Sequence, residues 1–277
     1  MRRRLLAFNL GKAVFVLPNL FTLSSIFCGF YAIILAGQEP APEQLYRASV
    51  AVFFGVFFDM ADGRVARLTR TQSAFGVQLD SLADLGTFGV APAVILYHWA
   101  LESMGLLGVA AAFVYVACGA MRLARFNVLA ARSPGPMKYF IGVPIPTAAG
   151  VLLALVMFHQ RTFATPPGHV ESILVLVLIV SYLMISNVRY RTFKDLRPTR
   201  KSLTIIFTLL VLFAAISAKV KPTFALLAFS WGYLTLGMLE EVIFFRRRRH
   251  EGTPPHPPAD PTPPSAAPLP SPSEKRS

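Results

Sequence analysis

The sequence is a succession of apolar stretches, each about 20 residues long, and this pattern restricts the fold more than any other feature. An α-helix of that length crosses the ~30 Å hydrocarbon core of a membrane and satisfies its own backbone hydrogen bonds there. Hydrophobic residues form 54% of the chain and charged residues 15%, which is typical of membrane proteins with several spans. We therefore expect an all-α polytopic membrane protein with about eight transmembrane helices. The expected spans are residues 14–36, 48–69, 75–99, 105–129, 143–160, 170–187, 202–218 and 222–245.

The Lys and Arg residues are distributed unevenly between the two sides of these spans. Of the 27, 23 fall on the side that holds the amino terminus, and the exceptions are Arg47, Arg161, Lys219 and Lys221. The positive-inside rule therefore places both termini in the cytoplasm and the protein in the cytoplasmic (inner) membrane. The same pattern accounts for the net charge of +13 by contact with anionic membrane lipid, without a nucleic-acid partner.

The two ends of the chain differ in composition from the part between them. Residues 1–12 are basic and are expected to lie at the membrane surface, and the apolar stretch that follows is too long for an ordinary signal peptide. The segment after Arg249 contains ten of the 22 prolines and too few apolar residues to fold. We expect residues 13–246 to form a transmembrane domain and residues 247–277 a disordered cytoplasmic tail.

Four aspartates interrupt the second and third expected spans, namely Asp59, Asp62, Asp80 and Asp84. An acidic group inside a membrane is costly, so such residues usually have a function. The first two aspartates are three residues apart and the last two are four apart, so each pair projects from one face of its helix. With a rise of ~1.5 Å per residue, antiparallel spans place both pairs ~8 to 14 Å below the cytoplasmic face. Asp59 is then level with Asp84, and Asp62 with Asp80.

Carboxylates at this spacing would repel one another unless a cation lay between them. Oxygen-only ligands favour hard cations such as Mg²⁺, Mn²⁺ or Ca²⁺. A pair of such ions could activate both the attacking and the leaving oxygen at a phosphorus centre. Gly63, Ala66 and Gly76 would leave room for a ligand beside the acids, although close helix packing also explains small residues. An ion pathway in a transporter and a purely structural acidic cluster are the alternative interpretations.

These residues belong to a longer pattern, Asp59-x2-Asp62-Gly63-x2-Ala66-Arg67-x8-Gly76-x3-Asp80-x3-Asp84. The pattern resembles the signature of the CDP-alcohol phosphatidyltransferase family at every defined position. The resemblance implies a six-helix core that typically forms a homodimer, here with two additional helices. It also implies that the four aspartates bind two divalent metal ions, Mg²⁺ or Mn²⁺, and that Asp84 acts as the catalytic base. The nucleotide or diphosphate would be bound by Asp62, Gly63, Ala66, Arg67 and Gly76.

Three further stretches bear on the acceptor alcohol. Residues 118–127, 140–150 and 182–195 resemble parts of the bacterial phosphatidylserine synthases within this family. The resemblance implies transfer of the phosphatidyl group of CDP-diacylglycerol to L-serine with release of CMP; glycerol 3-phosphate or an inositol compound is the alternative acceptor. The side chains expected at the acceptor or at the lipid phosphate are those of Arg122, Arg125, Asn127, Arg189, Arg191 and Lys194. The basic ones could equally extend to lipid headgroups or enforce the topology.

Overall fold

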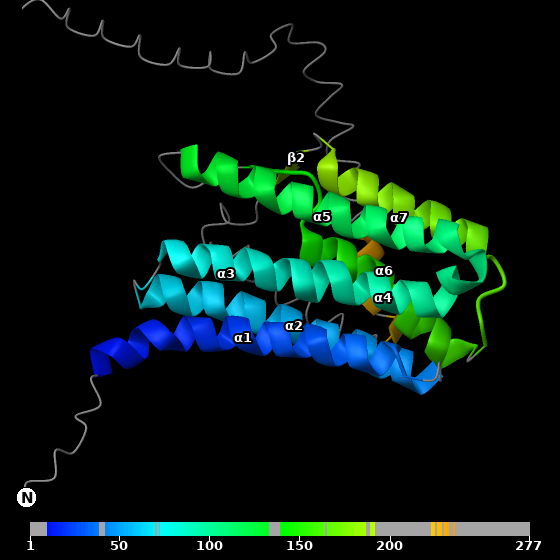
Figure 1. Ribbon diagram of the computed structural model, residues 1–277, viewed down its shortest axis with the longest axis horizontal. Coiled ribbons are helices and arrows are strands. Elements are labelled where there is room, and N and C mark those ends of the chain that lie inside the picture. Colours follow the sequence, from blue (N-terminus) through cyan, green and yellow to red (C-terminus); the bar gives the residue numbers. More distant parts are fainter. Residues whose placement is uncertain are drawn as a thin grey trace, which may run out of the picture. The chain divides into compact units, whose positions relative to one another are not determined.

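The computed structural model shows a bundle of packed helices (Figure 1). It describes residues 10–38, 42–69, 71, 73–132, 139–163, 165–186 and 189–191, and further along residues 223–224, 226–228, 230–232 and 235. The α-helices in this part of the chain are α1 (Leu10–Ala36), α2 (Pro42–Leu68), α3 (Ala74–Asp84), α4 (Ala91–Leu96), α5 (Leu106–Arg132), α6 (Ile145–Thr162) and α7 (Val170–Ile185). The π-helical segments η1 (Leu85–Val90) and η2 (Tyr97–Leu101) flank α4, and the short 3-10 helix η3 (Glu102–Met104) follows them.

The first six expected spans all coincide with helices. Within the described residues, three helical stretches are long and apolar enough to cross a membrane: Leu17–Ala36, Ala74–Met104 and Leu106–Ala131. The strands described are β1 (Tyr139–Ile141) and β2 (Arg189–Arg191), which pair antiparallel. The prediction of an all-α membrane fold is therefore confirmed apart from this short ladder. The span expected at 202–218 lies outside the described residues, and that at 222–245 is described only at helical positions between 223 and 235.

The core of the bundle lies around α6, which Figure 1 shows behind α4. Val151, Leu152 and Val156 of α6 are fully buried, and α6 packs against α2. In contrast, Phe27 of α1 and Phe54 of α2 are 66% and 59% exposed. Helices that are apolar on their outer faces as well as their inner ones are typical of a protein surrounded by lipid.

Two glycines allow α1, α2 and η1 to approach closely. A methyl group added at Gly29 would lie 2.7 Å from the Thr87 Cα atom, and one added at Gly55 would lie 2.6 Å from Thr87 Cγ2. At the same place, the Ser25 hydroxyl donates to the Gly55 carbonyl at 3.2 Å, and the Thr87 hydroxyl donates to the Ser25 carbonyl at 3.0 Å. This contact fixes the chain one turn beyond Asp84, so it sets how α3 lies against α2.

The π-helical segment η1 is supported from a second side by α5. The Tyr115 side chain is fully buried, and its hydroxyl donates to the Phe88 carbonyl at 3.0 Å. Such wide helical turns often occur beside functional sites. The expected single helix at 75–99 is thus a continuous helical run from Ala74 to Met104 that contains two π-helical segments.

Candidate functional site

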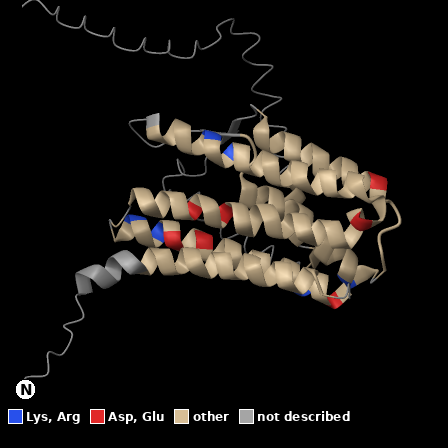
Figure 2. Cartoon of the chain, in the orientation of Figure 1, with Lys and Arg blue, Asp and Glu red and all other residues tan. Residues whose placement is uncertain are grey.

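The aspartates of α2 and α3 gather between these two helices. Figure 2 shows acidic residues on both helices near the same end of the bundle. Asp59, Asp62 and Asp80 can each place one carboxylate oxygen within 4.8 Å of the others. Asp84 lies close enough to Asp59 to interact with it electrostatically. The expected meeting of the two pairs across antiparallel helices is therefore present.

The chemistry of this cluster fits a divalent cation. Its donor atoms are all carboxylate oxygens, and hard ions such as Mg²⁺, Mn²⁺ and Ca²⁺ prefer oxygen ligands. One oxygen of Asp84, Oδ1, is buried and has no hydrogen-bond partner among the described residues. A buried carboxylate oxygen without a partner is costly, and a bound cation would remove that cost.

A residue outside the acidic motif also contacts the cluster. The Thr22 hydroxyl of α1 donates to Asp62 Oδ2 at 2.7 Å, and both side chains are buried. The sequence signal available for Thr22 was its depth. A hydroxyl in the half of the first span nearer the amino terminus lies at the level of the acids in the second span.

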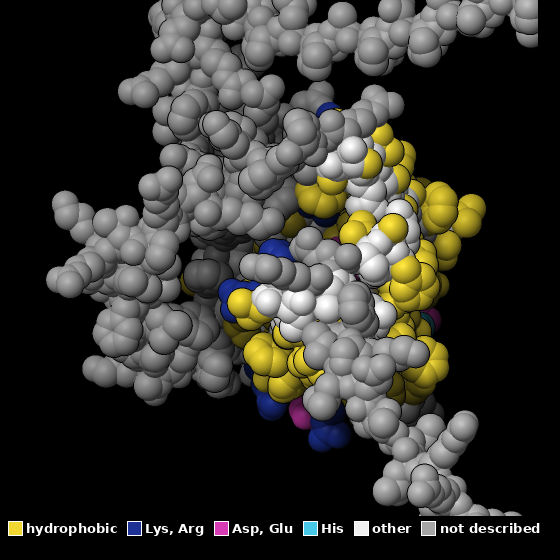
Figure 3. Space-filling view, turned by 90° about the vertical axis from the view of Figure 1, so that its left-hand side faces the viewer, with side chains coloured by type: hydrophobic (Ala, Val, Ile, Leu, Met, Phe, Trp, Pro, Cys, Tyr) yellow, Lys and Arg dark blue, Asp and Glu magenta, His cyan; other side chains and the backbone are white. Residues whose placement is uncertain are grey.

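Gly63 and Arg67 follow Asp62 on α2, and Gly76 precedes Asp80 on α3. A methyl group added at Gly63 would lie 3.8 Å from Arg67 Nη1, so the guanidinium group lies over this glycine. Arg67 is exposed and close enough to Asp62 to interact with it electrostatically. Gly76 lies in the first turn of α3, where its N–H donates to the Ser73 hydroxyl at 3.0 Å. The surface at this end of the bundle combines Lys and Arg side chains with apolar ones (Figure 3).

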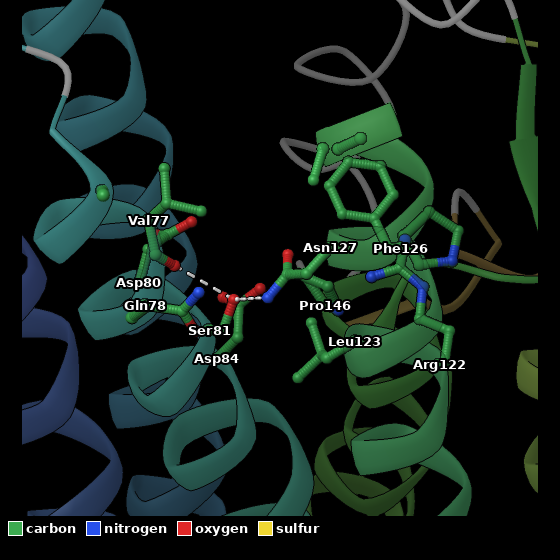
Figure 4. Close-up of a pocket in the computed structure, with 14 residues that line it drawn as sticks. Val77, Gln78, Asp80, Ser81, Asp84, Arg122, Leu123, Phe126, Asn127 and Pro146 are labelled. Carbon is green, nitrogen blue, oxygen red and sulfur yellow. Dashed lines mark hydrogen bonds between the residues drawn. The ribbon is translucent and has the colours of Figure 1, made fainter. Parts of the chain in front are cut away.

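A cavity of about 630 Å³ opens beside the aspartates, between α3 and α5. Asp80 and Asp84 line it from α3, and Arg122 and Asn127 line it from α5 (Figure 4). Its remaining lining residues are Ala74, Val77, Gln78, Ser81, Leu123, Phe126, Ala130, Ala131, Pro144 and Pro146. Acidic and basic groups therefore face each other across a space large enough for a small polar molecule.

Arg122 is the buried cation of this cavity. Its side chain is 7% exposed, its guanidinium carbon lies 5.5 Å from the centre of the Phe126 ring, and it interacts electrostatically with Asp84. Its Nε atom has no hydrogen-bond partner among the described residues. A buried guanidinium group with an unused donor suits an anionic group of a ligand.

Asn127 connects the two walls of the cavity. Its Nδ2 atom donates to the Ser81 hydroxyl at 2.8 Å, and this hydroxyl donates to the Val77 carbonyl at 3.1 Å. Ser81 lies between two of the aspartates in the sequence, so this bond ties α5 to the acidic face of α3. The side-chain carbonyl oxygen of Asn127 is an acceptor group.

Of the other residues proposed for the acceptor, the structure describes the side chain of Arg125. Arg125 does not line the cavity; its Nη1 atom donates to the Ile185 carbonyl of α7 at 3.4 Å. Arg189 and Arg191 lie in β2, but their side chains are outside the described part of the structure. Lys194 lies outside the described residues altogether.

The fold and the site together define a class: a helical membrane protein with an oxygen-only acidic cluster beside a polar cavity. Comparison with known families is more specific, since the family described as CDP-alcohol phosphatidyltransferase matches residues 15–184. The chain belongs to this family.

Curated relatives share most of the chain. A protein of Helicobacter pylori (strain ATCC 700392 / 26695) named CDP-diacylglycerol–serine O-phosphatidyltransferase is 38% identical over 227 residues, which are 82% of this chain and 91% of the relative. Proteins of the same name from Bacillus subtilis (strain 168) and Methanocaldococcus jannaschii are 34% and 35% identical. These alignments cover 64% and 65% of this chain, and 91% and 75% of the respective relatives.

Proposed function

We propose that the protein transfers the phosphatidyl group of CDP-diacylglycerol to the hydroxyl group of L-serine and releases CMP. The single observation that carries this proposal is the acidic cluster beside the cavity that contains Arg122 and Asn127. The names of the relatives from three distant organisms support serine as the acceptor. Family membership favours this activity over the transporter and scaffold alternatives.

Asp59, Asp62, Asp80 and Asp84 would hold two divalent metal ions, Mg²⁺ or Mn²⁺, with Ca²⁺ as a further possible occupant. When bound, such ions supply positive charge that stabilises the phosphoryl oxygens during transfer. Arg67 would bind the diphosphate, because it is an exposed cation at the rim of the cluster. Gly63, Ala66 and Gly76 would leave space for the nucleotide.

The cavity between α3 and α5 would bind serine. Arg122 would hold the serine carboxylate, and the carbonyl oxygen of Asn127 would accept from its ammonium group. The serine hydroxyl oxygen then forms the new bond to phosphorus, while the bond from phosphorus to the CMP oxygen breaks. Asp84 would receive the hydroxyl proton, since it lines the cavity and has a carboxylate oxygen without a described partner.

The proposal includes the arrangement in the membrane. The site would lie just below the cytoplasmic face, where the diphosphate of a CDP-lipid can reach it while the acyl chains stay in lipid. Both termini would lie in the cytoplasm, with eight spans inside residues 13–246, a basic surface segment before them and a cytoplasmic tail after them. Dimer formation is part of the proposal as a family property.

Glycerol 3-phosphate is the second candidate acceptor, because a buried arginine beside a cavity also suits a phosphate group. A panel of acceptors tests the choice. Purified full-length protein is incubated with CDP-diacylglycerol, Mn²⁺ and either L-serine, glycerol 3-phosphate or inositol, and CMP release is measured. We expect release that depends on serine. CMP release with glycerol 3-phosphate but not with serine would reject serine as the acceptor but would still support phosphatidyl transfer.

A further inference from the structure

Thr22 provides a direct contact between α1 and the acidic cluster. Its hydroxyl oxygen lies 2.7 Å from Asp62 Oδ2 and 3.2 Å from the carbonyl oxygen of Pro18, one turn earlier in the same helix. A hydroxyl has one proton to donate, and a charged acceptor at the shorter distance forms the stronger bond. The Thr22 hydroxyl therefore donates its proton to Asp62.

The contact between Thr22 and Asp62 is buried where α1 packs against α2. Thr22 is 4% exposed and Asp62 is 5% exposed, so water does not compete for this bond. One turn further along α1, the Ser25 hydroxyl donates to the Gly55 carbonyl of α2 at 3.2 Å, and this second bond fixes the two helices in register. The packing of α1 against α2 thus fixes the side chain of Thr22, and the hydrogen bond from Thr22 fixes the carboxylate of Asp62.

We propose that Thr22 is a positioning residue that holds the carboxylate of Asp62 in the orientation that binds a metal ion. A carboxylate has two oxygens, and a hydrogen bond to Oδ2 leaves the other oxygen for a cation shared with Asp59 and Asp80. Hydrogen-bond partners of metal-binding side chains orient these side chains, and their loss typically lowers metal affinity about 10- to 100-fold. The inference rests on the metal site of the proposed function.

Three variants separate this effect from a general loss of packing. Thr22→Val keeps the shape of the side chain but removes the hydroxyl, and Thr22→Ser keeps the hydroxyl but removes the methyl group. Ser25→Ala is the matched control, because it removes a buried hydroxyl that also joins α1 to α2 but does not contact an aspartate.

The experiment is a metal titration of the purified full-length protein, stripped of metal by EDTA, with Mn²⁺ alone and no lipid substrate. The readout is the rise in melting temperature as a function of Mn²⁺ concentration, since a ligand that binds the folded state stabilises it. For Thr22→Val we expect the midpoint of this rise at about 10- to 100-fold higher Mn²⁺. Thr22→Ser and Ser25→Ala should keep the wild-type midpoint, even where their metal-free melting temperatures are lower.

A wild-type midpoint for Thr22→Val would overturn the positioning role and leave the proposed function intact. An equal shift in Ser25→Ala would also overturn it, since the shift would then follow from weaker helix packing. If Thr22→Val does not fold, Thr22→Ala is compared with Thr22→Ser, and equal midpoints for these two reject the inference. Absence of any Mn²⁺ effect on the wild-type protein would reject the metal site and this inference together.

Discussion

At the residue scale, the site depends on a few charged groups that have no suitable partner within the described protein. Asp84 Oδ1 and Arg122 Nε are both buried without a hydrogen bond among the described residues, although their side chains interact electrostatically across the cavity. Leaving such groups unpaired costs stability, and a protein retains them where a ligand completes them. The acidic cluster and Arg122 can therefore each be tested by a substitution that nearly keeps the size of a side chain and removes its charge.

Asp80→Asn should abolish most of the activity while the fold is retained. The amide is nearly the same size as the carboxylate, but it carries no charge and is a weaker ligand for a hard cation. We expect CMP release to fall at least ~100-fold, as is typical when an electrostatic contact of the transition state is lost. Glu102→Gln is the control, because this acid lies far along the chain, is exposed and pairs with His98. Asp80→Asn with near wild-type release would contradict the role of the cluster.

Arg122→Gln should weaken the binding of serine more than that of the lipid substrate. Removal of one charged hydrogen-bonding partner typically costs about 1.5–3 kcal/mol, which corresponds to a KM for serine raised about 10- to 150-fold. The matched control is Arg125→Gln, since this arginine lies on the same helix but does not line the cavity. The measurement is the initial rate as a function of each substrate. An equal effect in the two variants would place serine elsewhere.

At the element scale, the position of α3 against α2 depends on the contact of Gly29 and Gly55 with Thr87. The two glycines remove side chains where the helices approach, and the hydroxyls of Ser25 and Thr87 bond across the same gap. The close approach that the two glycines allow lies one turn from the aspartates, so a side chain added at either glycine would displace the helices beside the site.

Gly29→Ala should destabilise the protein. The added methyl group would lie 2.7 Å from a backbone atom of Thr87, so the helices must move apart, and such overpacking typically costs about 1–3 kcal/mol. Gly86→Ala is the control, because a methyl group added there meets nothing within 4 Å. Thermal unfolding of the purified variants provides the measurement. A melting temperature lowered for Gly86→Ala but not for Gly29→Ala would contradict this account of the packing.

The elements of the core were predictable because long apolar stretches have few alternatives to a helix in lipid. The meeting of the aspartates was also predictable, since spacings of three and four residues select one helix face and antiparallel spans set the depth. The hydrogen bond of Thr22 to Asp62 was not predictable, because a buried threonine in a helix can equally donate to a carbonyl of the preceding turn. It was also not predictable that Arg122 lines the cavity and Arg125 does not, since the sequence does not show which face of α5 meets α3.

At the scale of the whole molecule, the orientation in the membrane decides which substrates reach the site. The aspartates lie toward the end of the bundle where α2 ends and α3 begins, and in the proposed topology this end would face the cytoplasm. L-serine and the CMP product are polar, so the site must open to the compartment that contains them. The loop between α6 and α7 would lie on the opposite side.

Labelling of single cysteines tests this orientation in intact cells. In a variant with Cys28 and Cys118 replaced by Ala, a cysteine at Gly168 should react with a membrane-impermeant thiol reagent, since this exposed position follows α6. A cysteine at Leu68, which is 84% exposed at the end of α2, should react only after the membrane is permeabilised. The reverse pattern would place the site on the outer side and exclude the proposed topology.

The most direct test of the proposed activity is the transfer of labelled L-serine into lipid by the purified full-length protein. The reaction contains CDP-diacylglycerol and Mn²⁺, and both lipid-bound label and free CMP are measured over time. We expect equal amounts of phosphatidylserine and CMP. Neither product should form when CDP-diacylglycerol is omitted, when EDTA replaces Mn²⁺ or when the Asp80→Asn variant is used. CMP release without incorporation of serine into lipid, or incorporation that is unaffected by Asp80→Asn, would contradict the proposed activity.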